Sequence, residues 1–353
     1  MGDKRMTRHL LDFIDITPEE FDRLYLLCEK IMKHPEKFIH ACAGKVSASL
    51  FYEPSTRTNL SFQTAMLRLG GSVIGFSDPG ASSVAKGESL KDTIMMMSNY
   101  ADVIVIRNPW EGAARAASLY SRVPVINAGD GGHLHPTQTL ADLTTIRKHL
   151  GRLDSINIGL CGDLKHGRTV HSLIKALSRY PNVRFYLISP RELKIPDYLR
   201  KYMIDHEQKF LEITSLEATI DTLDVLYMTR IQKERFTSES EYNRHKSAYT
   251  LTRAKLKPAR EHLLIMHPLP RVDEIHVDVD DDPRALYFRQ AQYGMYMRMA
   301  LLYEMLKQPL QTPAPVAIGG SRCTNPRCIT QCEPYLPGLE HNGCCVYCDK
   351  EIK

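Results

Sequence analysis

The sequence predicts an α/β protein with two domains, each a mostly parallel β-sheet flanked by helices, and a small C-terminal Cys₄ module. Short β-rich segments alternate with helical ones along most of the chain, a pattern typical of parallel sheets covered on both faces. The 353 residues are enough for two such domains. Six of the nine cysteines lie beyond residue 320, which indicates a separate unit.

The alternation places the elements in order. We expect strands near residues 46–52, 72–76, 102–107, 123–127, 156–161, 183–189, 224–229 and 263–267. We expect helices near residues 56–69, 88–99, 111–120, 136–149, 168–179 and 284–306. An earlier helix should begin at Thr17-Pro18-Glu19-Glu20, because a capping box and a proline at the first helical position coincide there.

The same pattern suggests where the domains divide. The first domain is expected at 1–150 and the second at 151–284, because a new strand–helix series begins after a helix and a glycine. The helix at 285–307 should return to the first domain. Residues 308–320 are rich in proline and indicate a stiff linker. Residues 321–353 then form the cysteine tail.

Composition narrows the function classes. Hydrophobic residues make up 43% and charged residues 25%, which is ordinary for a globular protein. No apolar run is long enough to span a membrane, and the N-terminus has no apolar signal-peptide core. We therefore expect a cytoplasmic protein without a membrane partner. A net charge of +5 is too small to indicate nucleic acid, but it suits anionic substrates.

The segment Ser55-Thr56-Arg57-Thr58 stands where an expected strand turns into a helix. Backbone amides and the positive end of the dipole favour an anion at such a helix start. The arginine adds a planar fork that matches phosphate. The alternative is that Ser55 or Thr56 only caps the helix, but a cap needs one such residue and four polar residues stand here. The segment therefore predicts a phosphate pocket.

Further polar side chains follow other expected strands. They are Arg107, His135, Arg168, Arg230, Gln232 and His267. Ligands bind at the carboxyl ends of strands in open parallel sheets. Any one of these residues alone could be a solvated arginine or a structural histidine, so their repetition is the informative feature. Since no nucleophile elbow or Walker loop occurs, we expect a substrate to supply the nucleophile and the protein to stabilise an oxyanion.

Several motifs in this order resemble the aspartate carbamoyltransferase (aspartate transcarbamoylase) family over roughly residues 5–310. The matching stretches are 51–58, 86–88, 111–115, 127–130, 135–139, 162–169, 227–235 and 267–274. The resemblance implies transfer of a carbamoyl group from carbamoyl phosphate to the amine of L-aspartate, by direct attack through a tetrahedral intermediate. The products are N-carbamoyl-L-aspartate and phosphate, in pyrimidine biosynthesis. No cofactor is expected in the catalytic site.

The resemblance also implies roles for individual residues. Those expected to bind carbamoyl phosphate are Ser55, Thr56, Arg57, Thr58, Arg107, His135, Gln138, Pro268 and Leu269. Those expected to act in catalysis are Arg57, Thr58, Lys86, Arg107 and His135. Those expected to hold the two aspartate carboxylates are Lys86, Arg168, Arg230 and Gln232. Bidentate arginine pairing explains the choice of a dicarboxylate.

In this family the catalytic unit is a trimer, and a loop from the neighbouring subunit completes each site. Lys86 and a nearby serine would belong to that loop. Ser82 fits by its distance from the lysine and Ser83 fits by local context, and we assign Ser82. On domain closure, Glu53 is expected to pair with Arg168 and Arg235.

The tail contains Cys323-x₄-Cys328 and Cys345-x₂-Cys348. This spacing fits a tetrahedral structural Zn²⁺ site, although disulfides are the alternative and Cys332 and Cys344 could compete as ligands. In the family, a similar zinc domain belongs to a separate regulatory chain that links catalytic trimers. Here it is fused to the catalytic part without the nucleotide-binding domain. We expect a structural and assembly role without nucleotide control, and pairing of trimers through the tail stays open.

Two other functions would require different features in the sequence. A carbamoyltransferase with another amino-acid acceptor, such as ornithine, usually carries His-Cys-Leu-Pro where this chain has His267-Pro268-Leu269-Pro270. A zinc-ribbon protein that binds nucleic acid would need more aromatic residues or a basic run in the tail. We therefore expect carbamoyl phosphate and L-aspartate as partners, and no nucleic acid.

Overall fold

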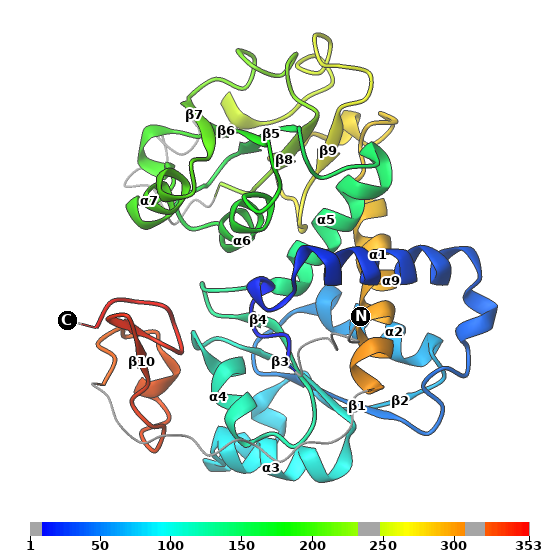
Figure 1. Cartoon of the computed structure of the whole chain (residues 1–353), viewed down its shortest axis with the longest axis vertical. Coiled ribbons are helices and arrows are strands. Elements are labelled where there is room, and N and C mark those ends of the chain that lie inside the picture. Colours follow the sequence, from blue (N-terminus) through cyan, green and yellow to red (C-terminus); the bar gives the residue numbers. More distant parts are fainter. Residues whose placement is uncertain (1–8, 232–247, 308–321, 353) are drawn as a thin grey trace. The chain divides into compact units, whose positions relative to one another are not determined.

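The computed structural model describes residues 9–231, 248–307 and 322–352 (Figure 1). The chain forms two compact units: the first runs to Thr137 and resumes at Met295, and the second is Gln138–Gly294. No helix among the described residues is long and apolar enough to cross a bilayer. The predicted linker 308–320 lies outside the described residues.

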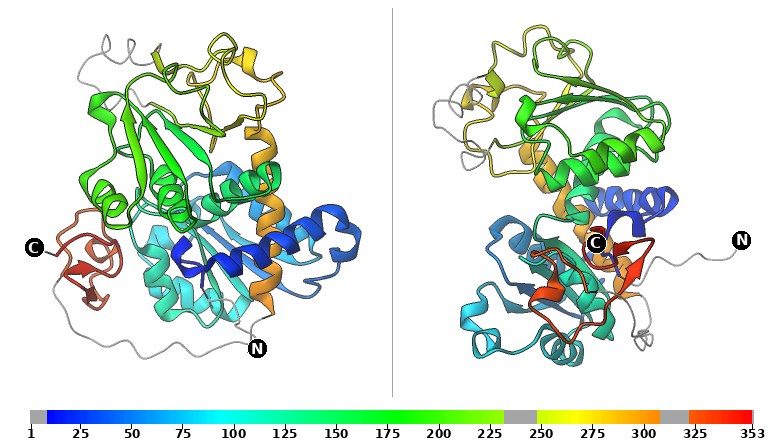
Figure 2. Two further views of the ribbon diagram at one scale, coloured as in Figure 1. Left: turned by 45° about the horizontal axis from the view of Figure 1, so that its top comes forward. Right: turned by 90° about the vertical axis from the view of Figure 1, so that its left-hand side faces the viewer.

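The first unit contains a four-stranded parallel sheet flanked by helices, as predicted (Figures 1 and 2). Its strands are β1 (Val46–Phe51), β2 (Ser72–Phe76), β3 (Val103–Asn108) and β4 (Val125–Asp130), in the order β2-β1-β3-β4. Its helices are α1 (Pro18–Lys33), α2 (Thr56–Arg68), α3 (Leu90–Tyr100) and α4 (Ala113–Tyr120). The chain extends the sheet in one direction from β1 to β2 and in the other from β3 to β4. The point where the direction reverses therefore lies between β1 and β3.

The second unit contains a five-stranded parallel sheet in the order β7-β6-β5-β8-β9. Its strands are β5 (Asn157–Cys161), β6 (Arg184–Ile188), β7 (Lys209–Ile213), β8 (Val225–Met228) and β9 (Leu264–Met266). Helices α6 (Arg168–Leu177) and α7 (Asp197–Asp205) belong to this unit. The order reverses between β5 and β8, so this sheet too has a ligand-binding position by the rule for open α/β sheets.

Two long helices carry the chain from one unit to the other. The division falls within α5 (Pro136–Leu150) and within α9 (Tyr287–Leu306). The expected boundary after residue 150 stands at the end of α5, whereas the compact second unit already includes most of that helix. Short 3₁₀ helices occur at Phe13–Asp15, Pro35–Phe38, Pro79–Ala81, Ser83–Lys86, Arg191–Leu193, Val277–Val279 and Ile329–Gln331.

Local chemistry explains where the structure departs from the sequence expectations. Helix α3 begins at Leu90 because the Ser89 side chain caps it, and α4 begins after Gly112, whose φ of 85° is left-handed. Strand β7 was not predicted, since it is a half-exposed edge strand with lysine and glutamate in its sequence. The tail holds a two-stranded antiparallel pair, β10 (Glu340–His341) and β11 (Cys344–Cys345).

Candidate active site and metal centre

The Ser55–Thr58 segment forms the start of α2, directly after β1 and beside the reversal of strand order. Ser55 occupies the N-cap position, but its side chain makes no capping hydrogen bond within the described structure. The simple capping alternative therefore does not account for this serine. Thr56 and Arg57 are exposed and Thr58 is buried. The helix start thus presents backbone amides, hydroxyls and a guanidinium to an anion.

Arg107 lies on the other side of the same reversal point, near the end of β3. The pairing of β3 with β4 shifts register between Ile106 and Asn108, so Arg107 stands at an irregularity of the sheet. Such irregularities often redirect a side chain next to an active site. The Arg107 guanidinium pairs with Glu53 at 2.8 Å, a contact that the sequence did not predict. Its Nε is buried without a hydrogen-bond partner in the part of the chain described here.

His135 follows the end of β4, and its side chain lies near that of Arg107. A Cβ on Gly129 would lie 3.0 Å from an Arg107 terminal nitrogen and 3.5 Å from the His135 ring, so both side chains border this glycine. The φ of +121° at Gly129 is a second reason why glycine is required. His135 is 5% exposed and precedes Pro136, the first residue of α5. Arg107 and His135 therefore converge at one edge of the sheet.

The electrostatics of this edge favour a bound anion. Burial and the charge of Arg107 both lower the pKa of the Arg57 guanidinium. Burial also lowers the pKa of Arg107, while Glu53 raises it. Two guanidinium groups close enough to repel each other are stabilised by a negative charge placed between them. The first unit thus has the donors and the charge for a phosphate group.

Lys86 ends the 3₁₀ helix Ser83–Lys86 and is exposed. The Ser82 hydroxyl donates to the Pro79 carbonyl at 2.8 Å and accepts from the Val84 amide at 3.3 Å, whereas Ser83 is exposed. A pocket of about 640 Å³ lies between this loop, β2 and α3, with Ile74, Ser82 and Lys86 in its lining. The choice of Ser82 over Ser83 as a site residue stays a prediction.

The predicted aspartate ligands of the second unit flank its own reversal point. Arg168 is the first residue of α6, which follows β5, and Arg230 follows β8. Strands β5 and β8 are paired neighbours, so their carboxyl ends meet at the same edge. Both arginines are half-buried. Gln232 and Arg235 lie outside the described residues, and the predicted closure contacts of Glu53 stay predictions.

Gln138 belongs to a buried polar network that the sequence analysis missed. Its Nε2 donates to Asp142 at 2.7 Å. The same carboxylate accepts from the amide of Gln290 at 2.6 Å and from the hydroxyl of Tyr227 at 2.9 Å. These contacts orient the Gln138 amide, and its binding of a ligand N–H group stays a prediction. The i,i+4 spacing of Gln138 and Asp142 was the only signal in the sequence.

A second network holds the loop that contains Pro268 and Leu269. The ring of His267 bonds Glu274 at 2.7 Å through Nε2 and accepts from the Leu269 amide at 2.8 Å through Nδ1. The other Glu274 oxygen accepts from two backbone amides of the loop at 3.1 Å. Burial raises the pKa of Glu274, but His267 and the backbone amides of Glu274 and Val272 outweigh it and lower the pKa overall. His267 therefore supports the loop.

The four predicted metal ligands converge in the tail. Cys323, Cys328, Cys345 and Cys348 are all buried, and their ligand atoms lie within 4.8 Å of one another. The sulfurs of Cys323 and Cys348 are 3.6 Å apart, and those of Cys328 and Cys345 are 3.9 Å apart. Zn–S bonds of about 2.3 Å in a tetrahedron place sulfurs about 3.8 Å apart. The cluster therefore fits a tetrahedral metal ion.

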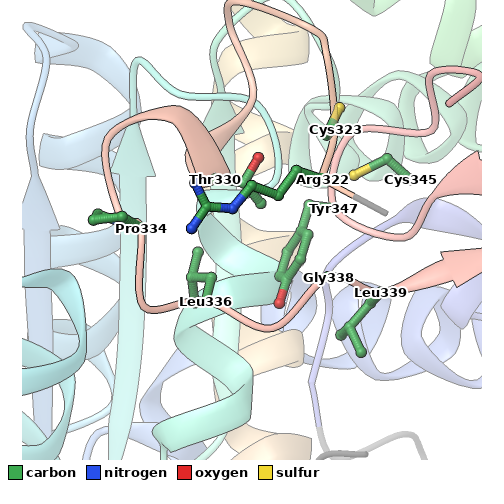
Figure 3. A pocket seen from close by; sticks show the side chains of 9 residues that line it. All are labelled: Arg322, Cys323, Thr330, Pro334, Leu336, Gly338, Leu339, Cys345 and Tyr347. Carbon is green, nitrogen blue, oxygen red and sulfur yellow. The ribbon is translucent and has the colours of Figure 1, made fainter. Parts of the chain in front are cut away.

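The thiol chemistry agrees with that geometry. All four are free cysteines, which disfavours the disulfide alternative. Hydrogen bonds among the clustered thiols lower the pKa of Cys348 and raise the pKa of Cys345. Beside the cluster, Tyr347 and Leu336 supply part of a small core (Figure 3). Cys332 is exposed and Cys344 is half-buried, and neither belongs to the set of four.

The cysteine module packs on the first unit of its own chain. The Glu111 amide donates to the Arg327 carbonyl, and the Ile329 amide donates to the Glu111 carbonyl, both at 2.9 Å. The Asn325 side chain also donates to the Glu111 carboxylate at 2.8 Å. A Cβ on Gly112 would lie 2.4 Å from the Tyr347 carbonyl, so the module approaches too closely for any other residue there. Hydrogen bonds and close packing therefore join the module to the rest of the first unit, to which it belongs.

An ion pair of the same interface gives a pH prediction. The His133 ring bonds Asp130 at 3.1 Å and Asp349 of the module at 3.0 Å. Burial opposes its charge, but the two carboxylates raise the pKa of His133 to about 10, from 6.5 in the unfolded chain. A raised pKa stabilises the fold fully below pH 6.5, and that stabilisation declines until pH 10. We expect the difference in melting temperature between the wild type and His133→Gln to be largest near pH 6 and to shrink towards pH 10. A difference that does not change with pH would contradict this.

Two models of carbamoyltransferase domains match most of this chain. Residues 8–148 match the family model "Aspartate/ornithine carbamoyltransferase, carbamoyl-P binding domain", and residues 154–305 match "Aspartate/ornithine carbamoyltransferase, Asp/Orn binding domain". The chain therefore has the fold of a carbamoyltransferase. Each of its two parallel sheets carries cationic groups where the order of strands reverses. Within this class, the chain belongs to the aspartate carbamoyltransferase catalytic-subunit family.

Individual relatives support this assignment. The aspartate carbamoyltransferase catalytic subunit of Clostridium perfringens is 59% identical over 300 residues, covering 85% of this chain and 98% of the relative. The catalytic subunit of M. jannaschii aspartate transcarbamoylase is 51% identical with a TM-score of 0.82, covering 85% of this chain and 98% of that one. Aspartate transcarbamoylase from Trypanosoma cruzi, solved with carbamoyl phosphate and aspartate, is 37% identical with a TM-score of 0.78, covering 84% and 95%.

Proposed function

We propose that this chain transfers the carbamoyl group of carbamoyl phosphate to the amine of L-aspartate, giving N-carbamoyl-L-aspartate and phosphate. The observation that carries the proposal is the convergence of Arg107 and His135 around Gly129, at the same reversal of strand order where Arg57 begins α2. The relatives are named as aspartate carbamoyltransferases, and the proposed reaction is the one that this name describes. Pyrimidine biosynthesis is the context that the family implies.

In the proposed reaction, the first unit binds carbamoyl phosphate. The start of α2 and Arg57 hold the phosphate, and Thr58, Arg107 and His135 donate to the carbonyl oxygen. The aspartate amine attacks the carbonyl carbon, a C–N bond forms, and the oxygen becomes an oxyanion that these donors stabilise. The C–O bond to phosphate then breaks, and the amine proton leaves with the phosphate. No covalent enzyme intermediate is needed.

The second unit supplies the remaining groups. Arg168 and Arg230 bind the two aspartate carboxylates by charge-assisted hydrogen bonds. Gln138 accepts from the carbamoyl NH₂ group, since Asp142 already takes its amide nitrogen. The Pro268 and Leu269 carbonyls accept from the same NH₂ group, and Glu274 and His267 keep their loop in place. This division assigns one substrate mainly to each unit.

A direct assay tests the proposal. Purified protein is mixed with carbamoyl phosphate and either L-aspartate or L-ornithine, and phosphate release is followed. We expect release with L-aspartate and none above background with L-ornithine. Turnover with L-ornithine alone would replace the acceptor. No turnover with either amino acid would overturn the proposed function.

We propose that the active oligomer is built on a trimer, in which Lys86, together with the serine assigned at position 82, reaches the site of a neighbouring subunit. The exposure of Lys86 and the open pocket beside its loop support this arrangement. Mixing two variants of low activity, Lys86→Ala and Arg57→Ala, tests it. Shared sites restore part of the activity in mixed trimers, whereas sites made from a single chain do not.

We also propose that the four tail cysteines bind a structural Zn²⁺ ion. Zinc would hold the four thiolates together and supply folding free energy to a module with a small core. Thiolate ligands require reducing surroundings, which supports a cytoplasmic location. The catalytic groups described above need no cofactor.

Metal analysis tests the zinc proposal. We expect one zinc per chain by elemental analysis, and loss of that zinc in Cys345→Ser. Cys332→Ser is the matched control, because Cys332 is exposed and lies outside the cluster, and it should retain the metal. Retention of full stoichiometry in Cys345→Ser, or loss in Cys332→Ser, would contradict the ligand assignment.

A further inference from the structure

We propose that the cysteine module positions the substrate loop of its own chain, the segment Ser82–Lys86, by capping α3. Glu333 and Tyr335 are the positioning residues. The inference rests on the proposed function in one respect, since it takes Lys86 to be a site residue. It assigns the module a role within one chain, in addition to any role in assembly.

The capping contacts are direct. The amide of Leu90, the first residue of α3, donates to the Glu333 carboxylate at 2.9 Å. The next amide, that of Lys91, donates to the Tyr335 hydroxyl at 2.8 Å. The third, that of Asp92, donates to the Ser89 hydroxyl at 3.1 Å. The first three helical amides thus have acceptors, and two of these come from the module.

These contacts matter because the start of a helix has no intrahelical acceptors for its first amides. A carboxylate at this position also interacts favourably with the helix dipole. The local sequence supplies only one cap, Ser89. Without the module, the Leu90 and Lys91 amides would depend on water, and the first turn of α3 would fray more readily.

The connection from α3 to Lys86 is short. Only Gly87, Glu88 and Ser89 separate the lysine from the helix. Backbone hydrogen bonds tie this link to the loop, since the Gly87 amide donates to the Val84 carbonyl at 2.9 Å and the Glu88 amide donates to the Ser83 carbonyl at 3.3 Å. Motion of the first turn of α3 would therefore pass to the loop and to Lys86 through these three residues.

Packing holds the module against this end of the helix. Leu90 and Ile94 of α3 share one buried cluster with Ile329, Leu336 and Tyr347 of the module. The ring of Tyr335 also meets that of Tyr120 edge to face, with centroids 6.1 Å apart. The Lys91 ammonium lies 5.3 Å from the centre of the Tyr120 ring. Glu333 and Tyr335 thus lie beside a core that includes the four clustered cysteines.

Hydrogen exchange tests the coupling without reference to activity. Tyr335→Phe keeps the ring and removes the hydroxyl, and Glu333→Gln keeps the shape and removes the charge. In the zinc-loaded full chain, we expect both variants to speed amide exchange in residues 87–91. Tyr100→Phe at the exposed far end of α3 and Glu340→Gln in the module are matched controls, and they should leave exchange there unchanged. Unchanged exchange in Tyr335→Phe and Glu333→Gln would overturn the proposal.

A double-mutant cycle links the cap to Lys86. Tyr335→Phe should lower kcat/KM for aspartate by about two- to tenfold, the effect of one lost hydrogen bond. In a Lys86→Ala background, the same change should have little further effect, because the positioned group is gone. An equal loss in both backgrounds would indicate general destabilisation and overturn the positioning role. If the wild type shows no carbamoyl transfer, the proposed function fails, while the exchange experiment still decides the coupling.

Discussion

Replacing Arg57 with alanine is expected to lower kcat by about 10²- to 10³-fold, the magnitude typical of losing one donor to developing negative charge in a preorganised site. Arg57 stands at the start of α2, next to Arg107, and the pKa of its guanidinium is lowered by burial and by that neighbour. Its charge should therefore act on the phosphate and on the negative charge that develops in the transition state. Steady-state kinetics with both substrates at saturation measure the effect.

Arg68→Ala is the matched control for this experiment. Arg68 lies in the last turn of the same helix and is exposed, so its removal takes away the same charge without touching the site. We expect its kcat to be within about twofold of the wild type. A near-normal kcat for Arg57→Ala would remove Arg57 from the catalytic set, and an equal loss in both variants would point to instability of α2.

Replacing Arg230 with alanine is expected to raise the KM for aspartate by roughly 10- to 150-fold and to leave the KM for carbamoyl phosphate nearly unchanged. The magnitude corresponds to a lost hydrogen bond to a charged group, about 1.5–3 kcal/mol. The position explains the selectivity, because Arg230 follows β8 at the reversal point of the second sheet. Initial rates across both substrate concentrations separate the two constants.

Arg191→Ala serves as the control, since Arg191 is an exposed arginine of the same unit, in a 3₁₀ helix. It should leave both KM values as they are. If Arg230→Ala instead spared aspartate and weakened only carbamoyl phosphate, the proposed division of substrates between the units would be wrong. In that case, removing one carboxylate from aspartate should weaken its binding less than the loss of an arginine–carboxylate contact would.

Much of the fold followed from local patterns. Apolar strand segments fixed β1, β3 and β5, and short-range signals such as the Thr17 cap and Pro136 fixed where helices begin. Strand β7 escaped prediction because an edge strand needs only one buried face and carries polar residues on the other. Helix α7 escaped for a related reason, since its burial involves few residues, Leu199 and Met203.

Residues of the candidate site could be proposed from the sequence where they stand close together in the chain. Ser55–Thr58 were proposed because four polar residues stand together at one helix start. The tail cysteines were proposed because they form two closely spaced pairs. Pairings between distant residues were not predictable. The Glu53–Arg107 ion pair, the Asp142 network and the Glu333 and Tyr335 contacts to α3 each join segments whose proximity depends on strand order and packing.

The sequence by itself therefore determined the alternating α/β architecture, the cationic and hydroxyl residues at the ends of strands and the four-cysteine set, since these depend on periodicity and short spacing. Only the tertiary structure decided that the order of strands reverses beside Ser55 and Arg107, and that the cysteine module lies on α3 of its own chain. The physical reason is that such proximity arises from the burial of apolar faces contributed by the whole unit, which no local stretch of residues encodes.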